Sequence, residues 1–207
     1  MSAAETRPTI VFAGDSVTDC GRREDPRELG DGYVEQLAAS RALRGFRVIN
    51  RGVAGDRVRD LKARWEREVL SQKPSIVSIL IGINDVWRRY DSDDPTPLGE
   101  FVADYRYLLE SLSQAGVSAV VCEPVLLPVN SDQEEWYEDL EPKLVAVRGL
   151  AAEFGARLVP TQTLLTALRR EGSTELAPDG VHPSPAGHLA LAATWLAHAP
   201  ITTPGSV

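Results

Sequence analysis

Short runs of apolar residues recur along the chain, at 9–13, 46–49, 76–81, 117–122 and 157–159. They are rich in valine and isoleucine and hardly alternate with polar residues, which is typical of parallel strands covered on both faces. The sequence therefore predicts about five buried strands.

Between these runs, apolar residues repeat every three or four positions, which predicts amphipathic helices. The three longest such patterns are Val58, Leu61, Trp65 and Val69; Leu98, Phe101, Val102, Tyr105, Leu108, Leu109 and Leu112; and Trp136, Leu140, Leu144, Val147, Leu150 and Phe154. A last helix is expected to begin near Ser184-Pro185, because Ser followed by Pro is a helix start signal, and to carry Leu189 and Leu196.

Strands that alternate with helices predict a three-layer α/β/α sandwich of the flavodoxin-like type, with right-handed crossovers. The length of 207 residues fits one domain over 1–207, and we expect flexible ends at 1–8 and 200–207. The polar, proline-containing stretches 91–97 and 124–132 are interpreted as loops.

The composition of the chain argues against several classes of function. The net charge of −8 argues against a nucleic-acid partner. No apolar stretch approaches the roughly 18 residues that span a bilayer, and the N-terminal residues lack the pattern of a signal peptide. Cys20 and Cys122 are isolated, which predicts no metal site and a reducing cytoplasm.

A polar, glycine-containing motif follows each of the first three strands. These motifs are Gly14-Asp15-Ser16, Gly52-Val53-Ala54-Gly55-Asp56 and Gly82-Ile83-Asn84-Asp85. Because the carboxyl ends of parallel strands meet at one edge of the sheet, where open α/β sheets bind ligands, we expect the three motifs to converge there.

Ser16 is the candidate nucleophile, and a serine hydroxyl needs a base to take its proton. Of the three histidines, only His182 has a carboxylate three residues earlier, at Asp179. A turn over these residues can bring the carboxylate to Nδ1 of the ring and leave Nε2 for the serine. The alternative is that this segment only caps the last helix.

An oxyanion in the transition state needs donors, for which the candidates are the backbone N–H groups of Ser16 and Gly55 and the side-chain amide of Asn84. Taken singly, Gly55 is better explained as a turn glycine and Asn84 as a helix N-cap.

The residues next to these candidates are expected to have structural or peripheral roles. Asp15 and Asp85 are expected to hold loop N–H groups, and Asp19, Asp56 and Arg57 to belong to the scaffold or the rim of the site. Trp87 either lines a substrate pocket or packs under the 91–97 loop.

The four motifs, with Asp179-Gly180-Val181-His182 as the last, resemble the sequence blocks of the GDSL or SGNH hydrolase superfamily. The resemblance gives Ser16, Gly55, Asn84, Asp179 and His182 the family's site roles. The stretches Gly14 to Arg22, Val58 to Glu66 and Ile81 to Arg88 are similar to the intracellular bacterial acetylxylan-esterase branch. In that branch a tryptophan can precede the catalytic aspartate, whereas Pro178 stands here. Oligomers are known in that branch, so the resemblance leaves a homo-oligomer open.

The resulting hypothesis is a serine esterase without metal or cofactor, which hydrolyses small acetyl esters such as acetylated xylo-oligosaccharides. Three alternatives belong to the same class: a general short-chain arylesterase, a thioesterase and a lysophospholipase. A non-catalytic ligand-binding module is the alternative from another class.

Overall fold

The structure, a computed structural model, describes residues 7–171, 175–199 and 201, so most of the ends expected to be flexible lie outside it. Its centre is a parallel sheet of five strands in the order β2-β1-β3-β4-β5. The strands are β1 (Thr9–Gly14), β2 (Arg47–Gly52), β3 (Ile76–Leu80), β4 (Ser118–Cys122) and β5 (Arg157–Val159). All five lie where the apolar runs predict them, in the flavodoxin-like order.

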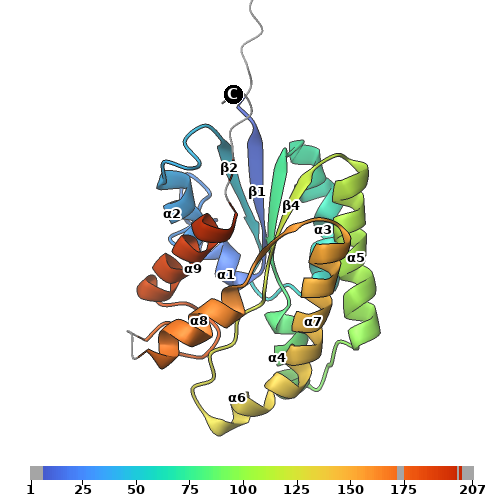
Figure 1. Ribbon diagram of the computed structural model, residues 1–207, viewed down its shortest axis with the longest axis vertical. Helices are drawn as coiled ribbons and strands as arrows, with labels where there is room; N and C mark the ends of the chain where they lie inside the picture. Colours follow the sequence, from blue (N-terminus) through green and yellow to red (C-terminus); the bar gives the residue numbers. More distant parts are fainter. Residues whose placement is uncertain (1–6, 172–174, 200, 202–207) are drawn as a thin grey trace, which may run out of the picture.

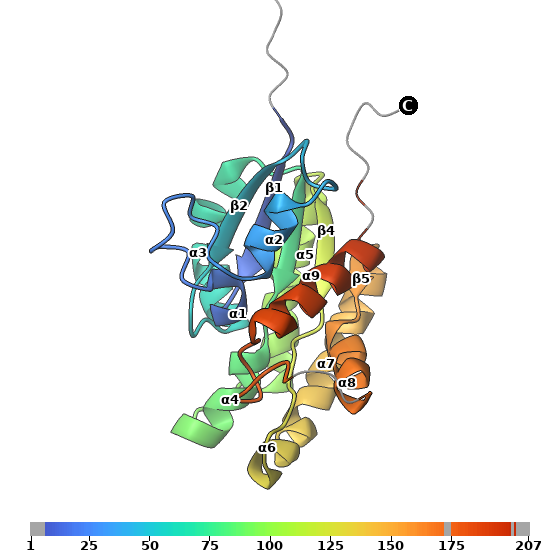
Figure 2. The ribbon, with the colours of Figure 1, turned by 90° about the vertical axis from the view of Figure 1, so that its left-hand side faces the viewer.

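Helices cover both faces of this sheet (Figure 1). One face carries α2 (Tyr33–Ala39), α8 (Thr161–Arg170) and α9 (Pro185–His198), while the other carries α3 (Val58–Glu68), α5 (Leu98–Gln114) and α7 (Tyr137–Glu153). Figure 2 shows α2 and α9 side by side on their face of the sheet. The predicted three-layer α/β/α sandwich is confirmed.

Strand β1 shows why helices must cover both faces of the sheet. Ile10 and Phe12 pack with Tyr33 and Trp195 on the α2–α9 side, and Val11 and Ala13 join the core on the α3–α5–α7 side. All four strand residues are fully buried, so neither face of the strand is polar and its residues do not alternate between apolar and polar.

The remaining helices are short and lie mostly near the carboxyl edge of the sheet. They are α1 (Ser16–Asp19), α4 (Ile83–Ser92), α6 (Ser131–Glu135) and the 3₁₀ turn η1 (Leu70–Gln72). The sequence analysis predicted none of these, nor α2 and α8. Their apolar residues are too few for a periodic pattern to stand out.

The expected bounds of two loops and the expected burial of two leucines are wrong. Residues 91 and 92 end α4 and residues 131 and 132 begin α6, so the two loops are shorter than expected. Leu98 and Leu189, assigned to buried helix faces, are 42% and 62% exposed. In α9 the buried apolar residues include Leu191 and Trp195, and Trp195 packs on Phe12 of β1, because the helix is rotated relative to the expected face.

Among the residues that the structure describes, no helix combines the length and the apolar composition needed to cross a membrane.

Candidate active site

Strand register brings the first three motifs together. The last residue of β1, Gly14, lies opposite Gly52 of β2 and Leu80 of β3. Because β1 lies between β2 and β3, the segments that leave these strands share the same edge. Ser16, Gly55 and Asn84 therefore emerge from three adjacent strand ends.

Ser16 is the first residue of the short helix α1. Asp15 caps this helix by accepting a hydrogen bond from the backbone N–H of Val17 at 3.0 Å. Cys20 ends the helix in a left-handed conformation, with φ of 43°. The turn is thus fixed at both ends, with the Ser16 side chain only partly buried and its N–H in the first turn, where no intrahelical partner exists.

A hydrogen-bond chain runs from Ser16 to Asp179. Ser16 Oγ lies 2.9 Å from His182 Nε2, and His182 Nδ1 lies 2.6 Å from Asp179 Oδ2. The other oxygen, Asp179 Oδ1, accepts from the N–H groups of Val181 at 2.9 Å and His182 at 2.7 Å. The structure therefore brings together the three residues expected to form the chain.

These contacts set the ionisation of Asp179. Partial burial opposes its charge, but the hydrogen bonds from the His182 ring and from two backbone N–H groups outweigh burial and hold its pKa below the usual value. A carboxylate that stays ionised can orient the imidazole and stabilise its protonated form.

The helix-cap alternative for this segment is wrong. The N-cap of α9 is Ser184, whose Oγ accepts a hydrogen bond from the N–H of Gly187 at 3.1 Å. Asp179 and His182 lie before the helix, and their side chains bond to each other rather than to its first turn.

The second motif presents an exposed turn. Gly55 has φ of +85°, which favours glycine, so its interpretation as a turn residue is confirmed. A Cβ atom there would meet nothing within 4 Å, which leaves the backbone accessible from outside.

Asn84 lies beside this turn. Its Nδ2 donates to the carbonyl of Asp56 at 3.0 Å, and the side chain is almost fully buried. An amide nitrogen carries two hydrogens, so one bond to Asp56 orients the group and leaves a second donor. The N-cap of α4 is Gly82, so the alternative that Asn84 is the cap is wrong.

The neighbouring acidic residues hold loop backbone, as expected. Besides the Asp15 cap, Asp85 Oδ2 accepts from the N–H of Val58 at 3.0 Å, and Asp19 Oδ2 accepts from the N–H of Ala54 at 3.1 Å. Burial raises the pKa of Asp15 to about 7 and that of Asp85 to about 6.

Arg57 and Asp56 also belong to the scaffold. Arg57 is buried and donates to the carbonyl and the carboxylate of Asp94, at 3.0 Å and 2.5 Å. Asp56 pairs with Arg64 of α3 at 2.7 Å. Both arginines thereby fix loops at the sheet edge.

Trp87 lies on α4 and faces His182. Their ring centroids are 5.9 Å apart, and Trp87 also contacts Trp136, at 5.6 Å. The position of Trp87 favours the pocket interpretation, because this ring flanks the imidazole. Pro178 is exposed.

Two residues absent from the sequence-based site lie against it. Trp136 packs on Trp87, and Gln133 of α6 bonds to the carbonyl of Asp179. Trp136 was assigned only to a helix core, and Gln133 sits in a short helix with no periodic signal. No feature of the sequence connects either residue with a segment more than 40 residues away.

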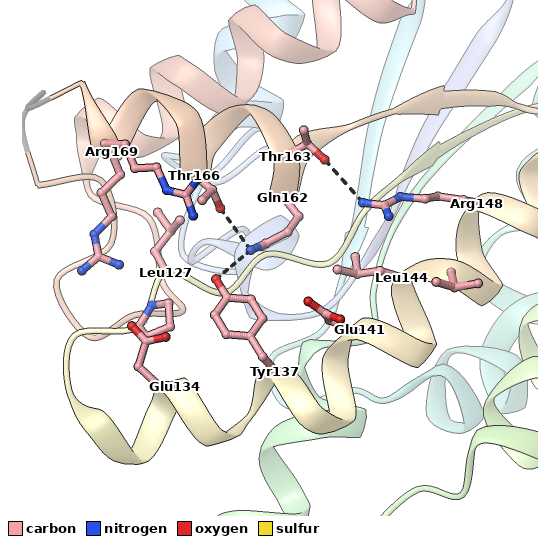
Figure 3. Close-up of a pocket in the computed structure, with 13 residues that line it drawn as sticks. Leu127, Glu134, Tyr137, Glu141, Leu144, Arg148, Gln162, Thr163, Thr166 and Arg169 are labelled. Atoms are coloured by element: carbon pink, nitrogen blue, oxygen red, sulfur yellow. Dashed lines mark hydrogen bonds between the residues drawn. The ribbon is translucent and has the colours of Figure 1, made fainter.

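A cavity of about 760 Å³ lies elsewhere, between α7 and α8. Figure 3 shows Gln162 bonded to Tyr137 and Thr166 across its floor, with Arg148 and Thr163 at one end. The residues that line it do not include the Ser16 chain, so the candidate site is instead the open sheet edge.

A serine, a histidine and a carboxylate, joined by hydrogen bonds at the carboxyl ends of a parallel sheet, define a serine hydrolase of the α/β class. The particular family follows from comparison. The chain belongs to the GDSL-like lipase/acylhydrolase family, whose model matches residues 12–190.

Related proteins agree with this assignment. The chain is 38% identical over 201 residues to an acetylxylan esterase from Geobacillus stearothermophilus, covering 90% of this chain and 91% of the relative. The crystal structure of the acetylxylan esterase Axe2 from that organism matches with a TM-score of 0.84 and 35% identity, covering 97% of each chain. LAE5, an α/β hydrolase from the metagenome of Lake Arreo, matches with a TM-score of 0.81 and 29% identity over 92% of this chain and 94% of its own. The protein is accordingly a carboxylic ester hydrolase.

Proposed function

We propose that this enzyme removes acetyl groups from carbohydrates, with short acetylated xylo-oligosaccharides as the substrate class, through an acyl-enzyme on Ser16. The observation that carries the proposal is the hydrogen-bond chain from Ser16 Oγ through His182 to Asp179. No metal or cofactor takes part in the proposed steps.

The first half of the reaction forms the acyl-enzyme. Ser16 Oγ attacks the ester carbonyl while His182 Nε2 takes its proton, and Asp179 holds the ring and stabilises the imidazolium. The negative charge on the carbonyl oxygen is met by the N–H groups of Ser16 and Gly55 and by the Asn84 amide. The tetrahedral intermediate then collapses: its bond to the sugar oxygen breaks, and His182 gives the proton to that oxygen, so the sugar leaves as an alcohol.

The second half releases acetate. Water takes the place of the sugar, His182 removes its proton, and the resulting attack on the acyl carbonyl forms a second tetrahedral intermediate. Its collapse returns the proton to Ser16 and regenerates the free enzyme.

Two observations support a carbohydrate substrate. The relative of 38% identity is an acetylxylan esterase. In this chain, the Trp87 ring stands beside His182, where an aromatic face can pack against a sugar, and the side chains of His182 and Asp179 remain 44% and 50% exposed. An open site of this kind accommodates a substrate that extends beyond the ester.

The nucleophile is tested by chemical labelling. A serine-directed phosphonate should modify Ser16, as located by peptide mass spectrometry, and Ser16→Ala should abolish both labelling and hydrolysis of p-nitrophenyl acetate. His182→Ala should cost about as much as Ser16→Ala, because triad members act as a unit. Ser71→Ala is the matched control and should keep full activity, because Ser71 is exposed in η1 and its hydroxyl bonds to the carbonyl of Arg67 and the side chain of Gln72. Label on another serine would refute the assignment.

The wider expectations remain part of this proposal. We infer a single hydrolase domain over 1–207 that acts on small esters in a reducing cytoplasm, with no nucleic-acid or membrane partner. Both cysteines are free thiols, in keeping with that compartment. The expectation of a homo-oligomer rests only on the resemblance of the sequence to a family branch in which oligomers are known.

A further inference from the structure

Gln133 uses both ends of its side-chain amide to join two loops. It lies on α6, which Asn130 caps, and its side chain is 9% exposed. Nε2 donates to the carbonyl oxygen of Asp179 at 2.7 Å, and Oε1 accepts from the N–H of Val129 at 2.9 Å. The amide therefore bridges the segment before α6 and the segment that carries the acid and base.

The next residue of that segment is fitted around the same side chain. Gly180 is buried with φ of +88°, and a Cβ added to it would lie 2.3 Å from Gln133 Oε1. The Gly180 carbonyl accepts from the N–H of Leu127 at 2.8 Å. The successive carbonyls of Asp179 and Gly180 are thus each held by a hydrogen bond from the segment around α6. Gln133 packs so closely on Gly180 that no side chain fits between them.

We propose that Gln133 is a positioning residue for the acid–base pair of Asp179 and His182. The proposal rests on the function proposed above. Gln133 bonds to the backbone of the acid and does not contact the reacting atoms. By holding the peptide between Asp179 and Gly180 in place, Gln133 fixes the backbone position from which the Asp179 carboxylate reaches the His182 ring.

The physical reason is the exposure of the pair itself. His182 and Asp179 are about half exposed, so neighbouring side chains pack against them on only part of their surface. Their geometry then depends on the backbone turn that carries them, and Gln133 and Leu127 are its hydrogen-bonding partners from outside the segment. A misplacement of about 1 Å in a reacting group can lower a rate by about a hundredfold.

Two substitutions separate the two bonds of Gln133. Gln133→Glu keeps an oxygen for the Val129 N–H but places a second acceptor against the Asp179 carbonyl. Gln133→Leu removes both bonds at similar volume. We expect each to lower kcat for p-nitrophenyl acetate about tenfold with KM within about twofold of wild type, the scale of one lost hydrogen bond.

The rate of phosphonate labelling at Ser16 should fall in parallel, because labelling also needs His182 to activate the serine. Ser111→Ala is the matched control. It removes the 2.7 Å hydrogen bond from Trp65 Nε1, between α3 and α5 on the far face of the sheet. This variant should lose a comparable amount of thermal stability while keeping wild-type kcat and labelling rate.

A double-mutant cycle tests the contact with Gly180. Gly180→Ala should lower kcat strongly, and in a Gln133→Ala background the same change should cost several-fold less, because the clash with the glutamine is gone. Additive effects on kcat would overturn a direct contact between the two positions in the working enzyme.

The outcomes also distinguish this inference from the proposed function. If wild type is labelled at Ser16 but Gln133→Glu and Gln133→Leu retain its kcat and labelling rate, the positioning role is overturned and the esterase stands. If Ser16 of wild type is not labelled, the proposed mechanism itself fails, and the positioning role fails with it.

Discussion

Asn84 shows how a single side chain can serve both the scaffold and the reaction. It is the second residue of α4, and its amide bonds to the carbonyl that follows the Gly55 turn. The turn therefore orients the amide in the free enzyme, and no reorganisation is needed when charge develops on the substrate oxygen.

Asn84→Ala should lower kcat by about 10²–10³, the usual cost of one lost oxyanion donor. KM should change little, because the donor acts on the transition state more than on the bound ester. Steady-state kinetics with p-nitrophenyl acetate measures both. Asn84→Asp, which keeps the shape but presents only acceptors when ionised, should lose a similar amount. Wild-type kcat in either variant would leave Asn84 with a structural role alone.

Trp87 is expected to limit the size of the acyl group, since its ring lies against the His182 imidazole. Acetyl esters should be hydrolysed with a higher kcat/KM than butyryl or octanoyl esters, because each clash weakens transition-state binding. Trp87→Ala should raise the octanoyl-to-acetyl ratio of kcat/KM about tenfold.

Tyr90→Phe is the control for this experiment. Tyr90 stacks on Trp136, one ring removed from Trp87, so its substitution should leave the ratio unchanged. A wild-type enzyme that prefers octanoyl to acetyl esters would contradict the carbohydrate proposal while leaving the Ser16 mechanism in place.

At the scale of elements, the edge of the sheet is held by buried carboxyl groups rather than by long helices. Asp15 caps the four-residue helix α1, and Asp85 reaches from α4 to the first N–H of α3. Such bonds fix short elements that could not persist alone. Their cost is burial of an acid: desolvation raises the pKa of Asp15 to about 7, with the carboxylates of Asp85 and Asp56 adding to the effect.

This pKa predicts how stability depends on pH. From about pH 4 to 7, the folded protein retains a proton on Asp15 that the unfolded chain has lost. The stabilisation from this group is therefore complete below about pH 4, and it is lost as the pH rises towards 7. Asp15→Asn keeps an acceptor for the cap but does not titrate, so its free energy of unfolding should fall less between pH 5 and 7.5.

Urea unfolding of wild type and Asp15→Asn at pH 5, 6, 7 and 7.5 measures this difference. Asp25→Asn, at a partly buried carboxylate that bonds to the N–H groups of Arg27 and Leu29, is the control, and its difference from wild type should stay constant over this range. Parallel curves for wild type and Asp15→Asn would show that Asp15 is ionised in the folded protein.

At the scale of the whole molecule, the strand order determines which segments meet. With β1 between β2 and β3, the loops that follow these strands lie next to one another, and the segment before α9 returns to the same edge. The candidate site thus gathers residues from positions 16 to 182 at one edge of the sheet.

Hydrolysis should survive treatment with EDTA, because the proposed reaction takes its nucleophile, base and oxyanion donors from the protein. Over 7–171, 175–199 and 201, no three His, Cys, Asp or Glu side chains are grouped to hold a metal ion. Esterase activity before and after chelation and gel filtration is the measurement. Loss of activity that a divalent ion restores would contradict the metal-free mechanism.

The sequence by itself determined the strands and indicated the candidate chemistry of the site. Runs such as Thr9 to Ala13 are apolar throughout because both faces are covered, and this pattern is visible without the fold. Ser16, Asp179 and His182 could be named because their residue types and motifs limit the reactions they can support. The same pattern reading missed α4 and placed Leu189 inward, since a few apolar residues do not define a helix face.

Only the tertiary structure decided which residues surround that chemistry. Gln133 and Trp136 lie beside the candidate acid and base through contacts across more than 40 residues of chain, and such contacts leave no periodic trace in the sequence. The cap alternative was likewise excluded by geometry, because Ser184 rather than Asp179 bonds to the first turn of α9. Local propensity limits what a residue can do, whereas long-range packing selects among those possibilities.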